Sequence, residues 1–123
     1  MTKGNLPEQE LMGLLRTVLG IKHQIIAVAS SFNLTLMQAI TLLFLDEPKS
    51  THEMSAIYKC DASNISGIVE GLLMKGLIIK KEDTLDRRIK YISLTVKGLN
   101  IRKEIILKLS EMLPVKNLSI GAL

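Results

Sequence analysis

The chain has 123 residues, of which 47% are hydrophobic, and it carries a formal net charge of +4 and a single cysteine. This length suits one domain with its own core, while the lone Cys60 excludes an internal disulfide and favours a reducing compartment. The positive charge fits a polyanionic partner, whereas an aromatic content of 3% disfavours stacking on single-stranded bases.

The first predicted element is a helix that begins near Pro7. Proline suits the first helical turn, and Glu8 and Glu10 suit the positive end of the helix dipole. Apolar residues then recur at helical spacing as far as Ile26. They cover a broader surface than one core-facing stripe needs, which indicates a second partner such as another subunit.

A second, short and buried helix is predicted at roughly 36–45, because Thr35 and Gln38 have the spacing of a capping box. Residues 24–45 contain no charge and approach the length of a membrane span, but polar and cap-forming residues interrupt them at 30–35. Two soluble helices joined by a turn explain this stretch better than a span does. The N-terminus lacks the apolar core of a secretory signal, so we expect a cytoplasmic protein with no membrane partner.

The next part of the chain predicts two short helices. Ser50 and Glu53 form a second capping box at the start of the first one. Asp61 suits the N-cap of the second helix, and Gly76 suits its C-terminal end. Two short helices with a tight connection and a glycine stop are typical of a helix-turn-helix. The expected elements are a turn at 46–50, a helix at 51–59 and a helix at 62–75.

A β-hairpin and a last helix complete the predicted fold. Residues 77–82 and 89–94 are rich in β-formers, and the charged segment DTLDRR lies between them. Thr95 is placed to cap a long helix that continues to about Leu113, before Pro114. A hairpin directly after a helix-turn-helix makes a winged helix-turn-helix. The predicted fold class is therefore mostly α with a small β-hairpin (α+β).

Motifs at fixed spacing distinguish this region from an isolated helix-turn-helix. The segment ASNISGIVEGLLMKGLI (62–78) is followed by DRR (86–88) and then by Thr95 and Gly98. In this combination the chain resembles the MarR family of winged-helix transcription regulators. The resemblance implies a homodimer whose two lobes straddle a palindromic operator in double-stranded DNA, and it favours a repressor. It also implies a cleft that binds a small-molecule effector.

The resemblance implies a single winged-helix domain, 1–123, whose segments have different functions. The expected parts are dimerisation helices at 1–31 and 96–123, a DNA-binding lobe at 34–95, a helix-turn-helix at 51–76 and a wing at 77–95. The side chains expected at the dimer interface are Leu11, Leu14, Val18, Ile105 and Leu109.

Two glycines depart from the family pattern. Gly67 and Gly71 stand where members of the family often carry arginine or lysine on the recognition helix. Each glycine lacks a side chain that could contact a phosphate or a base, and each costs about 1 kcal/mol of helix propensity relative to alanine. They leave open a second hypothesis, a winged-helix protein-interaction module that no longer recognises DNA.

The start of the 62–75 helix is the element expected to contact base edges. Ser63, Asn64 and Ser66 are short polar side chains on its leading turn, and Asn64 suits a bidentate contact with adenine. The alternative is that Ser63 and Asn64 only satisfy the helix N-terminus. Thr51, at the start of the preceding helix, is expected near a phosphate.

The charged tip of the hairpin supplies the other expected DNA contacts. The resemblance assigns Arg88 to a minor groove, and Asp86 would hold its guanidinium in a fixed geometry. Arg87, Lys80 and Lys90 add contacts with phosphate. Without the family context, a solvated hairpin with a surface ion pair worth at most about 1 kcal/mol would explain the same residues.

Neither a catalytic site nor a metal site is predicted. The serines lack a base at motif spacing, and no glycine-rich phosphate loop precedes a helix. The histidines and the cysteine are too scattered for a metal site, and no cofactor is expected. Cys60 is interpreted as a small core side chain. The alternative is an oxidation-sensitive thiol, because a nearby helix N-terminus favours the thiolate.

Overall fold

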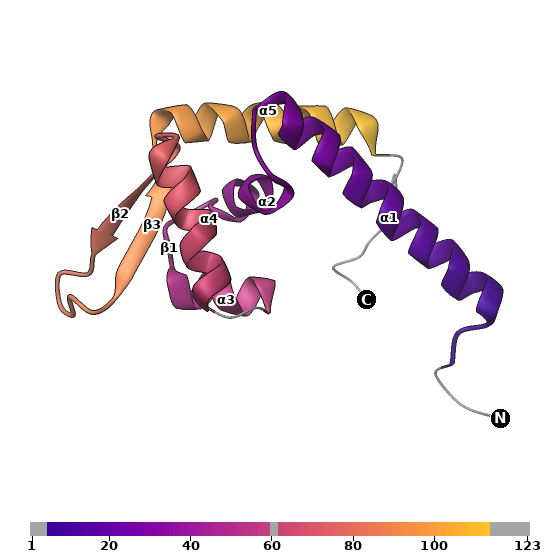
Figure 1. The fold of residues 1–123 in the computed structure, drawn as a ribbon, viewed down its shortest axis with the longest axis horizontal. Helices are drawn as coiled ribbons and strands as arrows, with labels where there is room; N and C mark the ends of the chain where they lie inside the picture. Colours follow the sequence, from indigo (N-terminus) through magenta and orange to yellow (C-terminus); the bar gives the residue numbers. More distant parts are fainter. Residues whose placement is uncertain (1–4, 60–61, 114–123) are drawn as a thin grey trace.

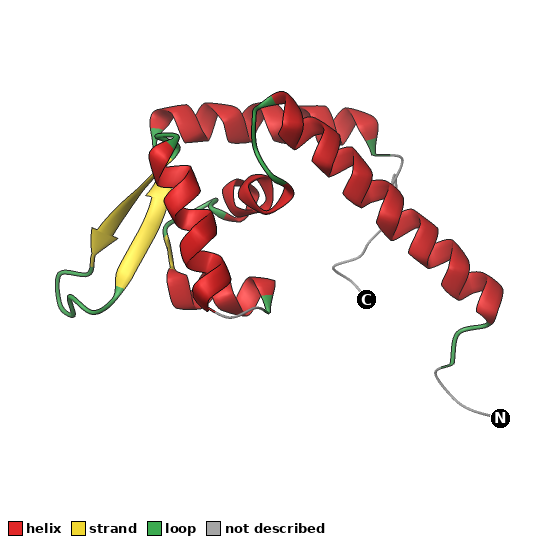
Figure 2. Ribbon diagram, in the orientation of Figure 1, coloured by secondary structure: helices red, strands yellow, loops and turns green. Residues whose placement is uncertain are grey.

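The computed structural model describes residues 5–59 and 62–113, and this part of the chain folds into five helices and one small antiparallel sheet (Figure 1). Figure 2 shows that the strands are confined to one side of a largely helical molecule. The predicted class, a mostly α winged helix with a small β-hairpin, is confirmed. The elements are α1 (Glu8–Ser31), α2 (Leu36–Phe44), β1 (Lys49–Ser50), α3 (Thr51–Tyr58), α4 (Ala62–Met74), β2 (Ile78–Glu82), β3 (Lys90–Leu94) and α5 (Val96–Met112).

Both predicted capping boxes are present. The Thr35 hydroxyl accepts a hydrogen bond from the Gln38 backbone N–H at 3.2 Å, and the Gln38 side chain accepts one from Thr35 N–H at 3.0 Å. Ser50 and Glu53 make the equivalent pair at 3.1 and 3.2 Å. These bonds satisfy N–H groups that have no partner inside the helix, and so fix where α2 and α3 begin.

Helix α4 ends at the predicted glycine. Gly76 has a φ of +70°, in the left-handed region that closes a helix, and its N–H donates to the Leu73 carbonyl at 3.0 Å. Three other residues with predicted roles, Cys60, Asp61 and Pro114, lie outside the described residues.

Helix α2 lies at the centre of the lobe, where it contacts α1, α4 and α5. Its Ala39 and Leu42 are fully buried. The α4 face that packs into the same core consists of Ile65, Val69 and Leu72. The helix-turn-helix is therefore held by a continuous apolar core rather than by surface contacts.

Helix α1 extends away from this lobe (Figure 1). Its buried residues are Val28 and Ala29, near its C-terminal end. Leu11, Leu14 and Val18 are between 39% and 52% exposed. Among the described helices, α1 alone is long and apolar enough to cross a membrane by length and composition. The uncharged stretch nevertheless divides into two helices, as predicted, because α1 ends before α2 begins.

Helix α5 corrects one prediction about the dimer interface. Ile105 and Leu109, expected to face a partner, are 0% and 8% exposed and belong to the core of the single chain. They are buried because α5 lies across α1 and α2. The large apolar side chains that remain uncovered on the second half of α5 are Ile106, Leu107 and Met112.

The sheet has the strand order β1-β3-β2. The predicted turn at 46–50 contains a strand that the sequence did not reveal, since β1 has only two residues and pairs through Ser50 with Tyr91. In the hairpin, Ile78 pairs with Leu94 and Lys80 with Ile92. Ile92 is fully buried, so this face of the wing packs on the core.

The base of the wing is fixed to the start of α5. The Thr95 hydroxyl donates to the Gly76 carbonyl at 2.7 Å, and the Thr95 N–H donates to the Leu77 carbonyl at 3.0 Å. Gly98 is buried beside this contact, and its N–H donates to the Thr95 hydroxyl at 3.0 Å. Thr95, the predicted cap of the last helix, therefore also ties the two ends of the hairpin together.

Candidate nucleic-acid interface

The exposed face of α4 carries little charge that suits DNA. Ser66 and Gly67 are exposed on this helix, and so is Glu70, a carboxylate. An added Cβ at Gly67 would meet nothing within 4 Å. Ser63 falls in the first turn of the same helix, and its side chain, predicted to contact DNA, lies outside what the structure describes. The Ser66 hydroxyl on this surface can contact DNA, but the Glu70 carboxylate opposes a polyanion.

Asn64 lies to one side of that face. It is exposed, but it also lines a depression of ≈ 430 Å³ together with Met37, Tyr58 and Ile68. The Tyr58 hydroxyl contacts the hydroxyl of Thr41 on α2. Asn64, which the sequence predicts to contact adenine, therefore lies beside residues of α2 and α3.

Gly71 lies against α2, which gives this glycine a packing role that the sequence did not reveal. An added Cβ at Gly71 would lie 2.5 Å from the side-chain nitrogen of Gln38. Gln38 is 9% exposed and also accepts a hydrogen bond from Lys75 Nζ at 3.0 Å. The glycine thus allows α4 to lie close to the Gln38 amide on α2, and any larger residue at this position would require the Gln38 side chain to shift.

The tip of the wing is a closed turn. One carboxylate oxygen of Asp83 accepts hydrogen bonds from the N–H groups of Leu85 at 3.2 Å and Asp86 at 3.0 Å. The Asp83 N–H donates to the Ile89 carbonyl at 2.9 Å, and the Ile89 N–H donates to the Asp86 carbonyl at 3.0 Å. The sequence interpretation missed Asp83, although an aspartate two residues before the tip is a common turn signal.

Asp86 and Arg88 form the ion pair that the sequence predicts. Arg88 Nε and Nη2 donate to the two carboxylate oxygens of Asp86 at 3.0 and 2.9 Å, and the Arg88 N–H adds a third bond at 3.1 Å. These hydrogen bonds hold the pKa of Asp86 below its ordinary value. The Arg88 side chain is 90% exposed, so its orientation is fixed while its charge stays in solvent.

The other basic side chains of the wing differ in whether they form ion pairs. Lys90 pairs with Glu82 across the hairpin at 3.3 Å, which partly neutralises one predicted phosphate contact. Lys80 and Arg87 are exposed, and neither forms an ion pair within the described part of the chain. Residues 77–95 carry five basic and three acidic side chains, so the wing is positive despite its carboxylates.

A groove joins the wing to the start of α3. Its volume is ≈ 350 Å³, and Ser50, Thr51 and His52 line one side of it. Residues 88–91 of the wing line the other side. Thr51 and Arg88, which are distant in the sequence, therefore border the same groove. The pairing of β1 with β3 creates this arrangement, because β1 leads directly into α3.

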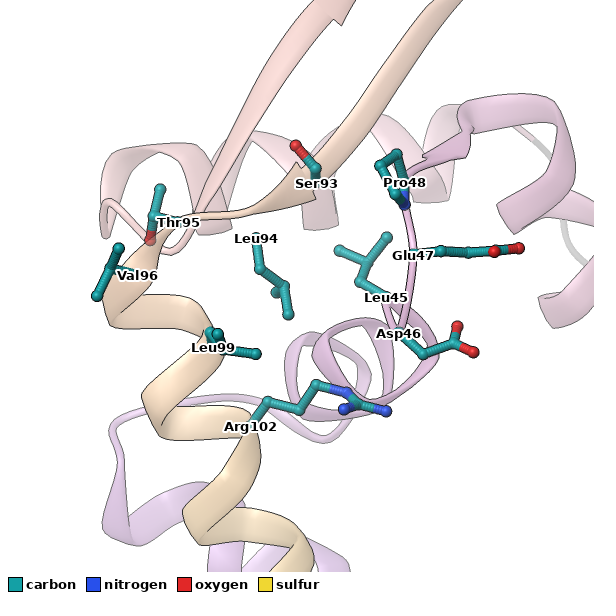
Figure 3. A pocket seen from close by; sticks show the side chains of 10 residues that line it. All are labelled: Leu45, Asp46, Glu47, Pro48, Ser93, Leu94, Thr95, Val96, Leu99 and Arg102. Carbon is teal, nitrogen blue, oxygen red and sulfur yellow. The ribbon is translucent and has the colours of Figure 1, made fainter.

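A second depression, of ≈ 300 Å³, lies between the loop after α2 and the start of α5 (Figure 3). Leu45, Leu94 and Leu99 converge on its centre. The Arg102 guanidinium at its edge donates to the Leu43 carbonyl at 3.2 and 3.0 Å. Arg102 thus caps the end of α2, and this depression is explained by helix packing.

Comparisons with known proteins place these features in a family. The model of the winged helix DNA-binding domain matches residues 34–98, which is more than half of the chain. Comparison with curated proteins gave no match.

Several solved structures share the fold. Apo MarR from E. coli has a TM-score of 0.74 at 18% identity, over 97% of this chain and 90% of that one. The regulator Tm0710 from Thermotoga maritima has a TM-score of 0.67 at 24% identity, over 85% and 75%. A cysteine-to-serine mutant of E. coli MarR, complexed with operator DNA, has a TM-score of 0.72 at 16% identity, over 89% and 79%. The chain thus belongs to the winged helix DNA-binding domain family, with the MarR-type fold that its sequence resemblance implied.

Proposed function

We propose that this protein is a homodimeric transcription regulator that binds a palindromic operator in double-stranded DNA and represses transcription. The observation that carries the proposal is the wing tip, where Asp86 presents an exposed, oriented Arg88. Thr51 borders the same groove as Arg88, and Ser66 is exposed on α4. An oriented arginine suits a narrow minor groove, where the negative potential is enhanced.

The dimer is supported by the uncovered apolar surface of α1. Leu11, Leu14 and Val18 are exposed along a helix that extends beyond the lobe. A contiguous apolar surface of this kind is typical of an interface between subunits. On α5, Ile106 and Leu107 are the proposed interface residues in place of the buried Ile105 and Leu109.

An effector site is proposed in the depression beside Asn64. A small molecule there would contact Met37 of α2 and Ile68 of α4 at once, and so could alter how α4 is presented to DNA. Met37→Trp should fill this space. An effector found by screening for release of DNA should then lose its effect on the variant while DNA binding persists.

Selection of bound genomic fragments by the purified protein tests the main proposal. We expect palindromic fragments, and a mass in solution of twice the 13.6 kDa of one chain. Arg88→Ala should weaken binding and lower the slope of log K against log salt by about 0.9, while Lys103→Ala, which removes an exposed charge on α5, should not. A dimer that binds no genomic fragment at low salt would overturn the proposal.

A protein-interaction module is the second candidate, favoured by the charge of the helix-turn-helix. Residues 51–76 carry two basic and three acidic side chains, and Glu70 is exposed on α4. For this candidate, DNA binding should be weak with a salt slope near zero. A stable complex with another protein that covers α4 would then be expected.

A further inference from the structure

The tip of the wing carries a leucine where hairpin turns usually carry polar residues. Leu85 is 95% exposed, which is the highest value among the large hydrophobic side chains of the described residues. Its side chain adds nothing to the core, so folding does not explain a leucine at this position. Single exposed apolar residues are common on protein surfaces, and exposure alone therefore assigns no role.

The backbone beneath this side chain is fixed. Asp83 accepts hydrogen bonds from Leu85 N–H and Asp86 N–H, and two further bonds between Asp83, Asp86 and Ile89 close the turn. Leu85 therefore projects from a turn whose conformation is set before any partner binds. A preorganised contact loses less conformational entropy on binding than a flexible one.

Leu85 also shares its turn with the oriented arginine. It directly precedes Asp86, whose carboxylate holds Arg88 through three hydrogen bonds. Because Leu85 and Arg88 are three residues apart in one closed turn, a wing that brings Arg88 to a minor groove also brings Leu85 close to the DNA. The minor groove is about 6 Å wide, and several DNA-binding proteins place leucine or other apolar side chains against its sugars or between its base steps.

We propose that Leu85 is a DNA-contacting residue that enters the minor groove beside Arg88 and packs on deoxyribose and base edges. This inference rests on the proposed function. Burial of an apolar side chain displaces water and not counterions, so its share of the affinity is independent of salt. Arg88 would thus supply a salt-dependent part of the affinity for the minor groove, and Leu85 a salt-independent part.

Binding of the selected operator, measured over a range of salt concentrations, separates these terms. Leu85→Ala should weaken binding about tenfold at every salt concentration, with the slope unchanged. Arg88→Ala should lower the slope by about 0.9. Val96→Ala is the matched control: Val96 is 77% exposed and begins α5 at the base of the wing, away from its tip, so this variant should bind as the wild type does.

Leu85→Met should keep near wild-type affinity, and no Leu85 variant should change the thermal midpoint, because the side chain is outside the core. Wild-type affinity of Leu85→Ala would overturn the inference while leaving the proposed function intact. A Leu85→Ala variant with a reduced slope would also overturn it, since Leu85 would then act by positioning Arg88. Failure of the wild-type protein to bind DNA would refute the proposed function itself.

Discussion

Alanine at Gly98 should destabilise the protein, because this glycine lies against the backbone of Leu77. An added Cβ would be 2.0 Å from the Leu77 carbonyl oxygen and 3.0 Å from its carbonyl carbon. Ordinary contact begins at 3.4 Å, so α5 and Leu77, the residue before β2, would have to separate by about 1.4 Å, the difference between 3.4 and 2.0. Leu77 is 1% exposed and has little room to move.

The cost follows from two changes at this contact. Overpacking of a closely packed site costs about 1–3 kcal/mol. Separation also breaks the 3.0 Å hydrogen bond from Thr95 N–H to Leu77, which adds about 1 kcal/mol. The higher helix propensity of alanine returns up to about 1 kcal/mol. The net loss is about 2 kcal/mol, a large part of the about 5–15 kcal/mol that stabilises a typical domain.

Urea unfolding followed by circular dichroism, at one protein concentration, measures this loss. Gly67→Ala is the matched control, because it is the same substitution on an exposed helix face with nothing within 4 Å. It should raise the stability by up to about 1 kcal/mol. A Gly98→Ala midpoint equal to or above that of the wild type would refute the close approach of α5 to Leu77.

Gly67→Lys should steepen the salt slope of DNA binding by about 0.9, and Gly67→Gln should not, because only lysine adds a cation to the exposed face of α4. Because the pKa of Asp86 is lowered, its ion pair with Arg88 stabilises the folded protein at pH values above 3.8, the ordinary pKa, and this stabilisation is lost as the pH falls further. The urea midpoints of the wild type and Asp86→Asn should therefore converge in acid. Leu14→Glu combined with Val18→Glu should halve the mass seen in sedimentation and abolish operator binding, whereas Lys22→Glu should do neither.

The sequence predicted those features whose causes lie within a few residues. A capping box needs a hydroxyl and a carboxyl or amide three residues apart, and Ser50 and Glu53 show this in the sequence itself. The stop at Gly76 is equally local. The pairing of Asp86 with Arg88 was predictable for the same reason, because the two residues share one turn.

The features that escaped prediction depend on distant contacts. The packing role of Gly71 depends on Gln38, which lies against it. The residues around Gly71 and around Gln38 in the sequence do not indicate this contact. Strand β1 exists only because Lys49 and Ser50 pair with Ile92 and Tyr91 of β3, which lies much later in the chain. Ile105 was assigned to the wrong surface because α5 carries apolar residues on several sides, and its packing on α1 and α2 decides which of them is buried.

The carboxylates of the wing explain how a hairpin with three acidic residues can still suit DNA. Each of them is engaged within the hairpin, since Glu82 pairs with Lys90, Asp83 accepts two backbone N–H groups and Asp86 holds Arg88. They fix the geometry of the tip, while Lys80 and Arg87 remain exposed. The helix-turn-helix has more acidic than basic residues, so in the proposed complex the wing must supply most of the salt-dependent affinity. A rigid tip is then a requirement, because displacement of Arg88 would remove a cation that α4 does not replace.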